Sequence, residues 1–367
     1  MRDIARHQAR GAARGVRARG GTPSGLLILR TGALGDAVLT LPLVAAARAA
    51  GLRRVVILGA PASWRFLAPA ASGVEAVDIE SRAWLGLFGT DARLGEGASQ
   101  ALSGIDAALV FLGDPRETAT AALRQAGVGR VIRASAPRRD EALPEPPAEP
   151  ADKPVEIAWP PLHRHAAARL LAPAAALGLC DERALWPAAP PSLADDDLLR
   201  LTPGETAAVL RALSLATAPS SGLLALHPGS GGIHKCWPAD RFAALAQAAQ
   251  RDWGVAPVFL IGPADAPCWE ALRRALPPGL APLVLRDRPL REVLALLALA
   301  RAYVGNDSGV THLAARACPT LALFGPTDPR VWHPLGRRVA VLRAASGDLA
   351  ALPVEAVLDA LAALLRA

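Results

Sequence analysis

Short apolar runs alternate with longer amphipathic segments along most of the chain, and many of the runs end in a glycine-rich or acidic turn. In the first half, the runs predicted to be strands are residues 26–29, 55–58, 76–79 and 107–111, and helices are expected over 37–50 and 163–177. Strands that alternate with helices are typical of a parallel sheet with helices on its faces. The pattern therefore predicts an α/β fold.

The second half repeats this alternation. Strands are predicted over 223–226, 258–261, 283–285, 302–304 and 320–324, and helices over 203–215, 238–251, 290–300, from about 309, and 354–366. Two α/β series in one chain indicate two domains of similar architecture. In such sheets ligands bind beyond the carboxyl ends of the strands, where the conspicuous turns of this chain lie.

Proline-rich segments interrupt the chain between the two series, and the first of them is either an interdomain linker or a long loop inside the first domain. Residues 136–161 and 187–191 contain too many prolines for a regular helix or a central strand. We expect a basic tail over 1–24, an N-terminal domain over 25–200, a C-terminal domain over 201–350, and a C-terminal helix over 351–367 that is able to pack back on the N-terminal domain.

Composition and cysteine usage narrow the class of protein. The chain has 367 residues, of which 52% are hydrophobic and 20% charged, which is typical of a globular protein. No charge-free apolar run approaches the ~18 residues of a membrane-spanning helix. The four cysteines lack CxxC spacing, which indicates reduced, mostly buried thiols in a cytosolic protein and argues against a zinc site. They are Cys180, Cys236, Cys268 and Cys318.

The positive charge is concentrated in the tail. Net charge is +7, and residues 1–24 contain six arginines and one aspartate, so they carry most of it. Arginines 2, 6, 10 and 14 would share one face of a helix that could meet an anionic membrane, but the four glycines in 11–21 favour a disordered extension. A transit peptide is also compatible with this composition, whereas a secretory signal is not. The body has no basic stripe, which argues against nucleic-acid binding.

Two glycine-rich turns in the second half have the features of anion sites. The segment GNDSGVTHLA (305–314) follows an apolar run and opens a helix, and the segment HPGSGG (227–232) follows another strand. Free N–H groups at the start of a helix attract phosphate. We therefore expect a diphosphate between these two turns.

The first glycine-rich turn differs from a dinucleotide-binding motif. GALGD (32–36) lacks the GxGxxG spacing, and the next strand ends without the acid that would hold a ribose. This argues against NAD binding. Two interpretations of Asp36 remain open: an acid directed into a cleft, and a carboxylate that caps the helix it begins.

Lys235 and two histidines are the remaining candidates. The chain has 38 arginines but only two lysines, and Lys235 directly follows the HPGSGG turn, so it is either a phosphate ligand or a solvated loop residue. His227 and His312 lie in the two turns and are either packed or close to a phosphate. No HExxH or GxSxG motif is present, which disfavours a catalytic metal and a serine nucleophile.

Four segments in this order resemble glycosyltransferase family 9, the lipopolysaccharide heptosyltransferase group. They are RTGALGD, HPGSGGIHKCWP, YVGNDSGVTHLAA and LFGPTDPRVWHP, and the resemblance extends from about residue 25 to about 345. It implies a GT-B fold, in which two Rossmann-like domains face each other across a cleft. The first domain would bind the acceptor and the second the nucleotide sugar.

The resemblance also implies roles for single residues. Asp36 would be the base that deprotonates the acceptor hydroxyl, with Gly35 on the acceptor side. The donor side would be formed by Ser230, Gly231, Lys235, Asp265, Asp307, Ser308, Gly309 and His312. Among these, Lys235 and the N–H groups of Ser308 and Gly309 would meet the diphosphate, and the two aspartates the ribose or sugar. No metal is expected, because N–H groups at a helix start and one lysine can stabilise the charge of the departing diphosphate. No cofactor is expected, because the nucleotide sugar is a substrate.

The function implied is an inverting transfer of a sugar, a heptose from ADP-heptose, to a cell-envelope glycan or lipid-linked acceptor. We expect a cytoplasmic protein, and peripheral contact with the inner face of an anionic membrane is compatible with the tail. Two alternatives stay open: a nucleotide-sugar 2-epimerase of the same architecture, and a non-catalytic nucleotide-sugar binding protein. Arg30, Arg65 and Arg116 would either meet an acidic acceptor or be surface charges.

Overall fold

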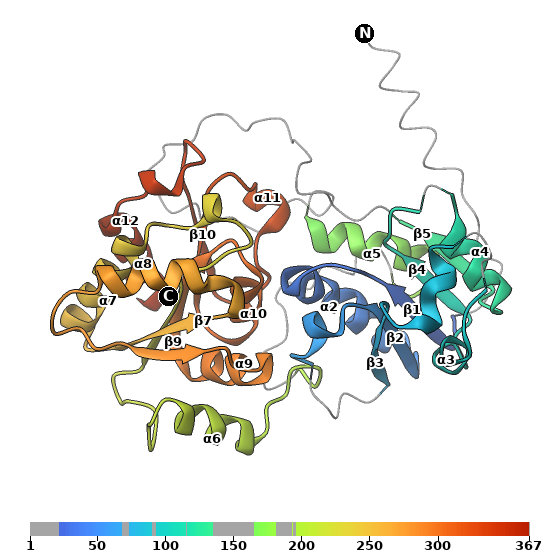
Figure 1. Ribbon diagram of the computed structural model, residues 1–367, viewed down its shortest axis with the longest axis horizontal. Helices are drawn as coiled ribbons and strands as arrows, with labels where there is room; N and C mark the ends of the chain where they lie inside the picture. The colour runs from blue at the N-terminus through green and yellow to red at the C-terminus, as the bar shows by residue number, and fades with distance from the viewer. Residues whose placement is uncertain are drawn as a thin grey trace, which may run out of the picture.

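Two parallel sheets form the framework of the chain. The computed structural model describes residues 22–67, 73–89, 93–114, 116–134, 165–180, 193 and 196–366. The first sheet has five strands in the order β3-β2-β1-β4-β5 and the second has six in the order β11-β10-β9-β6-β7-β8. The halves that they form lie side by side, the N-terminal one in blue and green and the C-terminal one in yellow to red (Figure 1). The α/β prediction is confirmed.

The predicted strands are all present. The N-terminal sheet contains β1 (Gly25–Leu29), β2 (Arg54–Gly59), β3 (Val74–Asp78), β4 (Ala107–Val110) and β5 (Arg130–Arg133), and the C-terminal sheet contains β6 (Leu223–His227), β7 (Ala256–Ile261), β8 (Leu283–Arg286), β9 (Ala300–Asn306), β10 (Thr320–Phe324) and β11 (Val339–Arg343). The sequence patterns missed β5 and β11. Both are edge strands with only one neighbour, so their apolar runs are short and interrupted.

Helices cover the faces of both sheets. They are α2 (Leu34–Ala49), α3 (Glu96–Ala101), α4 (Thr118–Gln125), α5 (Ala166–Ala176), α6 (Pro203–Ala212), α7 (Ala239–Trp253), α8 (Ala266–Ala275), α9 (Leu290–Leu299), α10 (Gly309–Ala317), α11 (Pro329–Trp332) and α12 (Val354–Arg366). The helix α2 begins three residues before its predicted start and continues through Pro42. Asp36 therefore lies in the first turn of α2 rather than in a preceding loop.

Side chains that alternate along the strands separate an inner core from two outer ones. In β1, Leu26 and Ile28 belong to a cluster that also contains residues of α2, α5, α9 and α10, so both halves share it. Leu27 and Leu29 face the other side, where they pack against the segment 84–123. A third cluster lies under α7 and α12 on the outer face of the C-terminal sheet.

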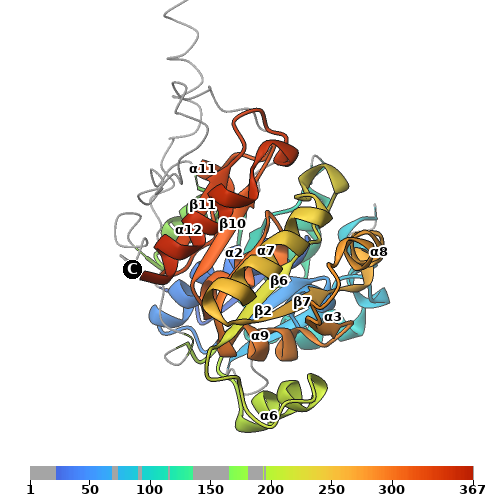
Figure 2. The same ribbon diagram turned by 90° about the vertical axis from the view of Figure 1, so that its left-hand side faces the viewer.

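The position of α12 corrects one expectation. Its buried residues Val357, Ala360, Leu361 and Leu364 pack on the outer core of the C-terminal sheet. The final helix therefore packs on the C-terminal half and not back on the N-terminal half. Views from two sides show it beside the red and orange strands of that half (Figures 1 and 2).

The helices α2 and α10 lie against each other where the two halves meet. Each has an arginine in its last turn, and these arginines bind two adjacent acids of the connecting segment. Arg48 of α2 is 2.6 Å from Asp197, and Arg316 of α10 is 2.6 Å from Asp196. The Arg316–Asp196 pair is buried, with side-chain exposures of 6% and 8%.

A third arginine ties α6 and α9 to the N-terminal half. Arg291 of α9 makes two bonds to Glu205 of α6, at 2.7 and 2.8 Å, and donates to the carbonyl oxygen of Phe66 at 3.0 Å. The bond to Arg291 is the main reason why the pKa of Glu205 falls to about 2. Charge-assisted hydrogen bonds therefore add to the shared apolar core in connecting the two halves.

Two other expectations concern parts of the chain that have little or no described structure. The basic tail lies outside the described residues up to position 21, and so do the proline-rich segments 136–161 and 187–191.

Within the described ranges, no helix is both long enough and apolar enough to cross a bilayer. All four cysteines are free thiols, and only Cys318 is buried, so the expectation of mostly buried thiols was wrong.

Candidate functional site

Three turns of the C-terminal half meet at one edge of its sheet. The strands β9, β6 and β7 are neighbours, and all three are parallel, so their carboxyl ends lie together. The turns that follow them are 306–308, 228–232 and 262–265. Parallel pairing thus brings together the two predicted anion turns and the loop that contains Asp265.

Asn306, the last residue of β9, holds two of these turns in place. Its side-chain amide donates to the carbonyl oxygen of Pro228 at 2.8 Å, and its side-chain oxygen accepts from the N–H of Trp237 at 2.9 Å. The side chain is completely buried. Because an asparagine side chain both donates and accepts, this one residue can fix both ends of the segment that contains Lys235.

Lys235 and Asp307 form a buried ion pair. The Lys235 Nζ lies 2.7 Å from Asp307 Oδ2, and the two side chains are 11% and 10% exposed. The interpretation of Lys235 as a solvated loop residue is therefore wrong. Ser230 Oγ donates to the backbone oxygen of Asp307 at 2.7 Å. The two turns are thus joined by a charged and a neutral contact.

A hydrogen-bonded chain connects Asp265, His227 and Ser308. Asp265 Oδ2 is 3.0 Å from His227 Nε2, and His227 Nδ1 is 3.2 Å from Ser308 Oγ. Burial alone would raise the pKa of the Asp265 carboxyl, but the bonds to His227 and to the N–H of Gly262 outweigh it and lower the pKa. The carboxylate lies directly beneath the turn, since a Cβ at Gly229 would be 1.8 Å from Asp265 Oδ1.

The N-terminal end of α10 contacts the N-terminal end of α2. Ser308 caps α10 and accepts from the N–H of Thr311. A Cβ built on Gly309 would lie 2.7 Å from the Cβ of Leu34 and 2.8 Å from the backbone nitrogen of Gly35, and one built on Gly35 would lie 3.2 Å from His312 Cδ2. The two glycines therefore permit a close approach between the turn that contains Asp36 and the turn of the donor side.

Asp36 is held by a buried arginine. Arg30, at the end of β1, is 2.7 Å from Asp36 Oδ1, and the exposures of the two side chains are 7% and 17%. Asp36 Oδ2 accepts from the N–H of Ala33 at 3.1 Å, so the capping interaction considered for Asp36 is present. Burial lowers the pKa of the Arg30 guanidinium, and the charge of Asp36 opposes this shift. Arg30 is therefore not a surface charge, whereas Arg65 and Arg116 are exposed.

Three buried histidines, His165, His312 and His333, interact close to this junction. His165 Nε2 is 2.8 Å from the backbone oxygen of His333, and His165 Nδ1 accepts from the N–H of Ala167 at 3.1 Å. A neutral ring with its proton on Nε2 satisfies both contacts. Burial, with a smaller contribution from the neighbouring His312, lowers the pKa of His165 to about 3 and of His333 to about 4.

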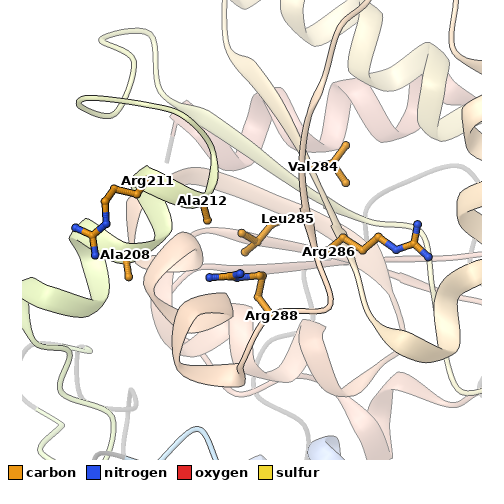
Figure 3. A pocket seen from close by; sticks show the side chains of 7 residues that line it. All are labelled: Ala208, Arg211, Ala212, Val284, Leu285, Arg286 and Arg288. Carbon is orange, nitrogen blue, oxygen red and sulfur yellow. The ribbon is translucent and has the colours of Figure 1, made fainter.

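A cavity of about 510 Å³ lies elsewhere, at the edge strand β8. It is lined by residues of α6 and of the segment 284–288, and it contains none of the site residues described above. Figure 3 shows Arg288 reaching toward Ala208, while Arg211 and Arg286 point outward on either side. The converging charges and helix ends lie instead at the junction between the halves.

Sequence analysis did not assign the contacts that three residues make in the site. Arg30, His227 and Asn306 each make a buried contact with, or next to, a residue named in advance. One feature of the sequence pointed to Asn306, because it is the sole asparagine of the chain. The partners of Arg30 and His227 depend on how the turns fold, and spacing along the chain does not reveal them.

Comparisons with known proteins agree with this architecture. The family model described as glycosyltransferase family 9 (heptosyltransferase) matches residues 200–359. Lipooligosaccharide heptosyltransferase 2 of Haemophilus influenzae is 34% identical over 159 residues, which are 41% of this chain and 45% of that protein. In sequence, the chain thus spans less than half the length of this curated relative.

Two solved structures match almost the whole chain. The family 9 glycosyl transferase of Veillonella parvula has a TM-score of 0.71 at 19% identity and covers 94% of this chain and 97% of its own. The Escherichia coli ADP-heptose lipopolysaccharide heptosyltransferase II has a TM-score of 0.66 at 20% identity, with 93% and 98% covered. At these identities the similarity establishes the fold, and the GT-B prediction is confirmed. The chain is thus similar to glycosyltransferase family 9 in sequence over residues 200–359, and it has the GT-B fold over nearly its whole length.

Proposed function

We propose that the chain is an inverting glycosyltransferase that transfers heptose from ADP-heptose to a cell-envelope glycan acceptor. The observation that supports this most is the contact between the first turns of α2 and α10. It brings the turn with Asp36 and the turn with Asp307 and Ser308 to one junction. A single displacement requires a base from one side and a charge-stabilising site for the leaving group on the other.

The C-terminal half would bind the departing diphosphate. The first turn of α10 has free N–H groups and the positive end of the helix dipole, and Lys235 lies in the neighbouring turn. Such groups stabilise charge that develops on phosphate oxygens as the anomeric bond breaks. In this chain Lys235 is already paired with Asp307, so an incoming phosphate would share Lys235 with that carboxylate.

The N-terminal half would supply the base. In the proposed step the acceptor oxygen forms a bond to the anomeric carbon, the bond from that carbon to the diphosphate breaks, and the hydroxyl proton passes to Asp36. Arg30 and the N–H of Ala33 fix the two carboxylate oxygens of Asp36. Each oxygen retains a second lone pair for the proton. The capping contact and the role of base are therefore compatible in one residue.

The proposed localisation and partners follow from the same reaction. ADP-heptose and the glycan or lipid-linked acceptor are its partners, and the donor would be encountered in the cytoplasm. The relatives named above are heptosyltransferases, which favours a transferase over the epimerase or the non-catalytic binding protein. Asp265, His312, Ser230 and Gly231 remain proposed donor-side residues.

Turnover of ADP-heptose by the Asp36→Asn variant tests the proposal. We expect release of ADP to slow by about 10²–10⁴-fold, because an amide cannot take the proton, while the affinity for ADP stays nearly constant. Asp78→Asn, which alters an exposed acid at the end of β3, is the control and should keep full activity. Unchanged turnover in Asp36→Asn would remove Asp36 as the base. Epimerisation of a UDP-linked sugar by the wild type would replace the proposal with the alternative.

A further inference from the structure

The short helix η2 (Arg82–Leu87) exposes an apolar stripe on the N-terminal half. A 3₁₀-helix has three residues per turn, so side chains three apart lie above one another. Trp84 and Leu87 form the inner face and are buried. Leu85 and the adjoining Phe88 lie on the outer face, 63% and 57% exposed.

This exposure is unusual within the molecule. Among the described residues, the large hydrophobic side chains with high exposure are these two and Ile233. Single exposed apolar residues are common, but two on successive turns of one helix form a patch. Since the inner face of η2 already packs on the outer core of the N-terminal sheet, the outer stripe is free to contact something else.

Exposed arginines surround the stripe. Arg82 stands on the same face, one turn before Leu85. The backbone of Arg93 lies against Gly86, where a Cβ would be 2.0 Å from the Arg93 carbonyl oxygen. Arg116 lies two residues before Thr118, whose hydroxyl donates to the carbonyl oxygen of Leu87 at 3.0 Å.

These arginines carry charge that the described acids leave uncompensated. None of the three is within ion-pair distance of a described acid. Among the described residues, the exposed acids nearest in sequence are Glu80, Glu96 and Glu117. The last of these is bound to Arg133 at 2.7 Å. An apolar stripe with three arginines around it is complementary to an anionic, apolar surface.

The stripe lies at the edge of the sheet that also carries the site. The helix η2 follows β3, and the turn with Asp36 follows β1. Both strands are parallel to β2, so their carboxyl ends point to the same edge. A surface bound through η2 would therefore lie at the edge from which an acceptor reaches Asp36.

We propose that the stripe Arg82, Leu85 and Phe88, together with Arg93 and Arg116, docks on an anionic lipid surface. Leu85 and Phe88 enter the boundary between headgroups and acyl chains, and the arginines bind lipid phosphates. A lipid is favoured over a protein partner because two apolar side chains provide far less than the roughly 800 Å² per partner of a stable protein interface. The docking does not depend on the proposed reaction.

Flotation of the full-length chain with vesicles of phosphatidylcholine and phosphatidylglycerol tests this proposal. The Leu85→Ser/Phe88→Ser variant should bind about 100-fold more weakly, about tenfold for each lost apolar contact, which corresponds to about 1.4 kcal/mol each. The matched control is Ile233→Ser, which removes an even more exposed apolar side chain from the C-terminal half and should leave binding unchanged. All of these proteins retain residues 1–24, so any contribution of the tail is common to them.

A second variant tests the contribution of the three arginines to vesicle binding. Arg82→Gln/Arg93→Gln/Arg116→Gln should weaken binding by about fivefold per residue and reduce its salt dependence, since each basic residue near an anionic surface contributes about 1 kcal/mol. The measurements need no donor or acceptor, so they remain valid if the proposed reaction is wrong.

Three outcomes would overturn the proposal. One is unchanged flotation of the Leu85→Ser/Phe88→Ser variant, and another is equal binding of the wild type to purely neutral vesicles. The third is a lipid-free dimer, seen by light scattering, that the same variant dissociates, because the stripe would then be a protein interface.

Discussion

The Lys235–Asp307 pair allows a direct test of the donor side. Lys235→Met removes the ammonium and keeps a long unbranched side chain, so the perturbation is mainly electrostatic. It has two separable consequences. It leaves the carboxylate of Asp307 without its cation in the free protein, and it removes the cation from the place where a diphosphate would bind.

The effect on stability follows from burial. Breaking a buried ion pair by removing one partner costs about 3–5 kcal/mol. Because about a tenth of each side chain reaches water, we expect the lower end, about 3 kcal/mol. The double variant Lys235→Met/Asp307→Asn should recover most of this loss, since it leaves no unpaired charge. Thermal unfolding of the four proteins of this cycle measures the coupling.

The effect on binding follows from the hydrogen bond to phosphate. A charge-assisted bond contributes about 1.5–3 kcal/mol, or about 10- to 150-fold in affinity. Since Lys235 would be shared with Asp307, we expect about 10- to 30-fold weaker binding of ADP. Adenosine, which lacks the phosphates, should bind within about twofold of the wild type.

Calorimetry with ADP and adenosine distinguishes the two roles of Lys235. Arg301→Met, which alters an exposed cation on β9, is the control for loss of one positive charge and should bind both ligands normally. If Lys235→Met loses the same factor for ADP and adenosine, Lys235 only shapes the turn and the reasoning fails.

Two further predictions concern stability and the junction. Burial keeps the pKa of His165 near 3 and of His333 near 4, below the ordinary value of 6.5. As the pH falls, the two histidines therefore bind protons in the unfolded chain before they do so in the folded protein. Between pH 7 and pH 5, each histidine should lower the free energy of unfolding by about 2 kcal/mol. Urea unfolding at both pH values should show that His165→Gln loses part of this dependence, whereas a change at the exposed His234 has no effect. Gly309→Ala would force a Cβ to 2.7 Å from the Cβ of Leu34, which should lower the free energy of unfolding by about 1–3 kcal/mol and slow turnover. The control Gly97→Ala, whose Cβ would be 3.4 Å from the Cβ of Ala83, should be neutral. Equal behaviour of the two glycine variants would contradict the close approach of α2 and α10.

The regular part of the fold could be predicted because buried strands of a parallel sheet are continuous apolar runs. Central strands such as β1 and β10 agree with the sequence patterns to within a residue. The edge strand β5 has the sequence RVIR, and four residues with charged ends carry too little apolar signal. The packing of α12 was not predictable from the sequence, because its apolar face could pack on either of the two sheets. Only the tertiary fold determines which sheet it covers.

The sequence predicted which turns form the site, but not the contacts between those turns. The residues 227–232 and 306–309 were assigned to one anion site because glycine, serine and a helix start each have a local meaning. The contacts that organise the site are between turns, such as the bond from Asn306 to Trp237, 69 residues away in sequence. Sequence spacing cannot show that Lys235 is paired with Asp307 before any phosphate arrives, and this pairing changes the expected strength of binding.

The two adjacent acids of the connecting segment have a mechanical consequence. Asp196 and Asp197 bind the arginines in the last turns of α10 and α2, while the first turns of these helices meet at Gly309 and at Leu34 and Gly35. Movement of one half against the other would therefore pivot at the acids and be largest at the opposite end. With about 1.5 Å of rise per residue, the nine residues of α10 form an arm of roughly 13 Å, and a rotation of about 15° would displace its tip by roughly 3 Å. In the proposed reaction, such a displacement would be large enough to separate the carboxylate of Asp36 from a sugar hydroxyl. The stiffness of the Asp196–Asp197 connection would then set how often these two groups are within reach of each other.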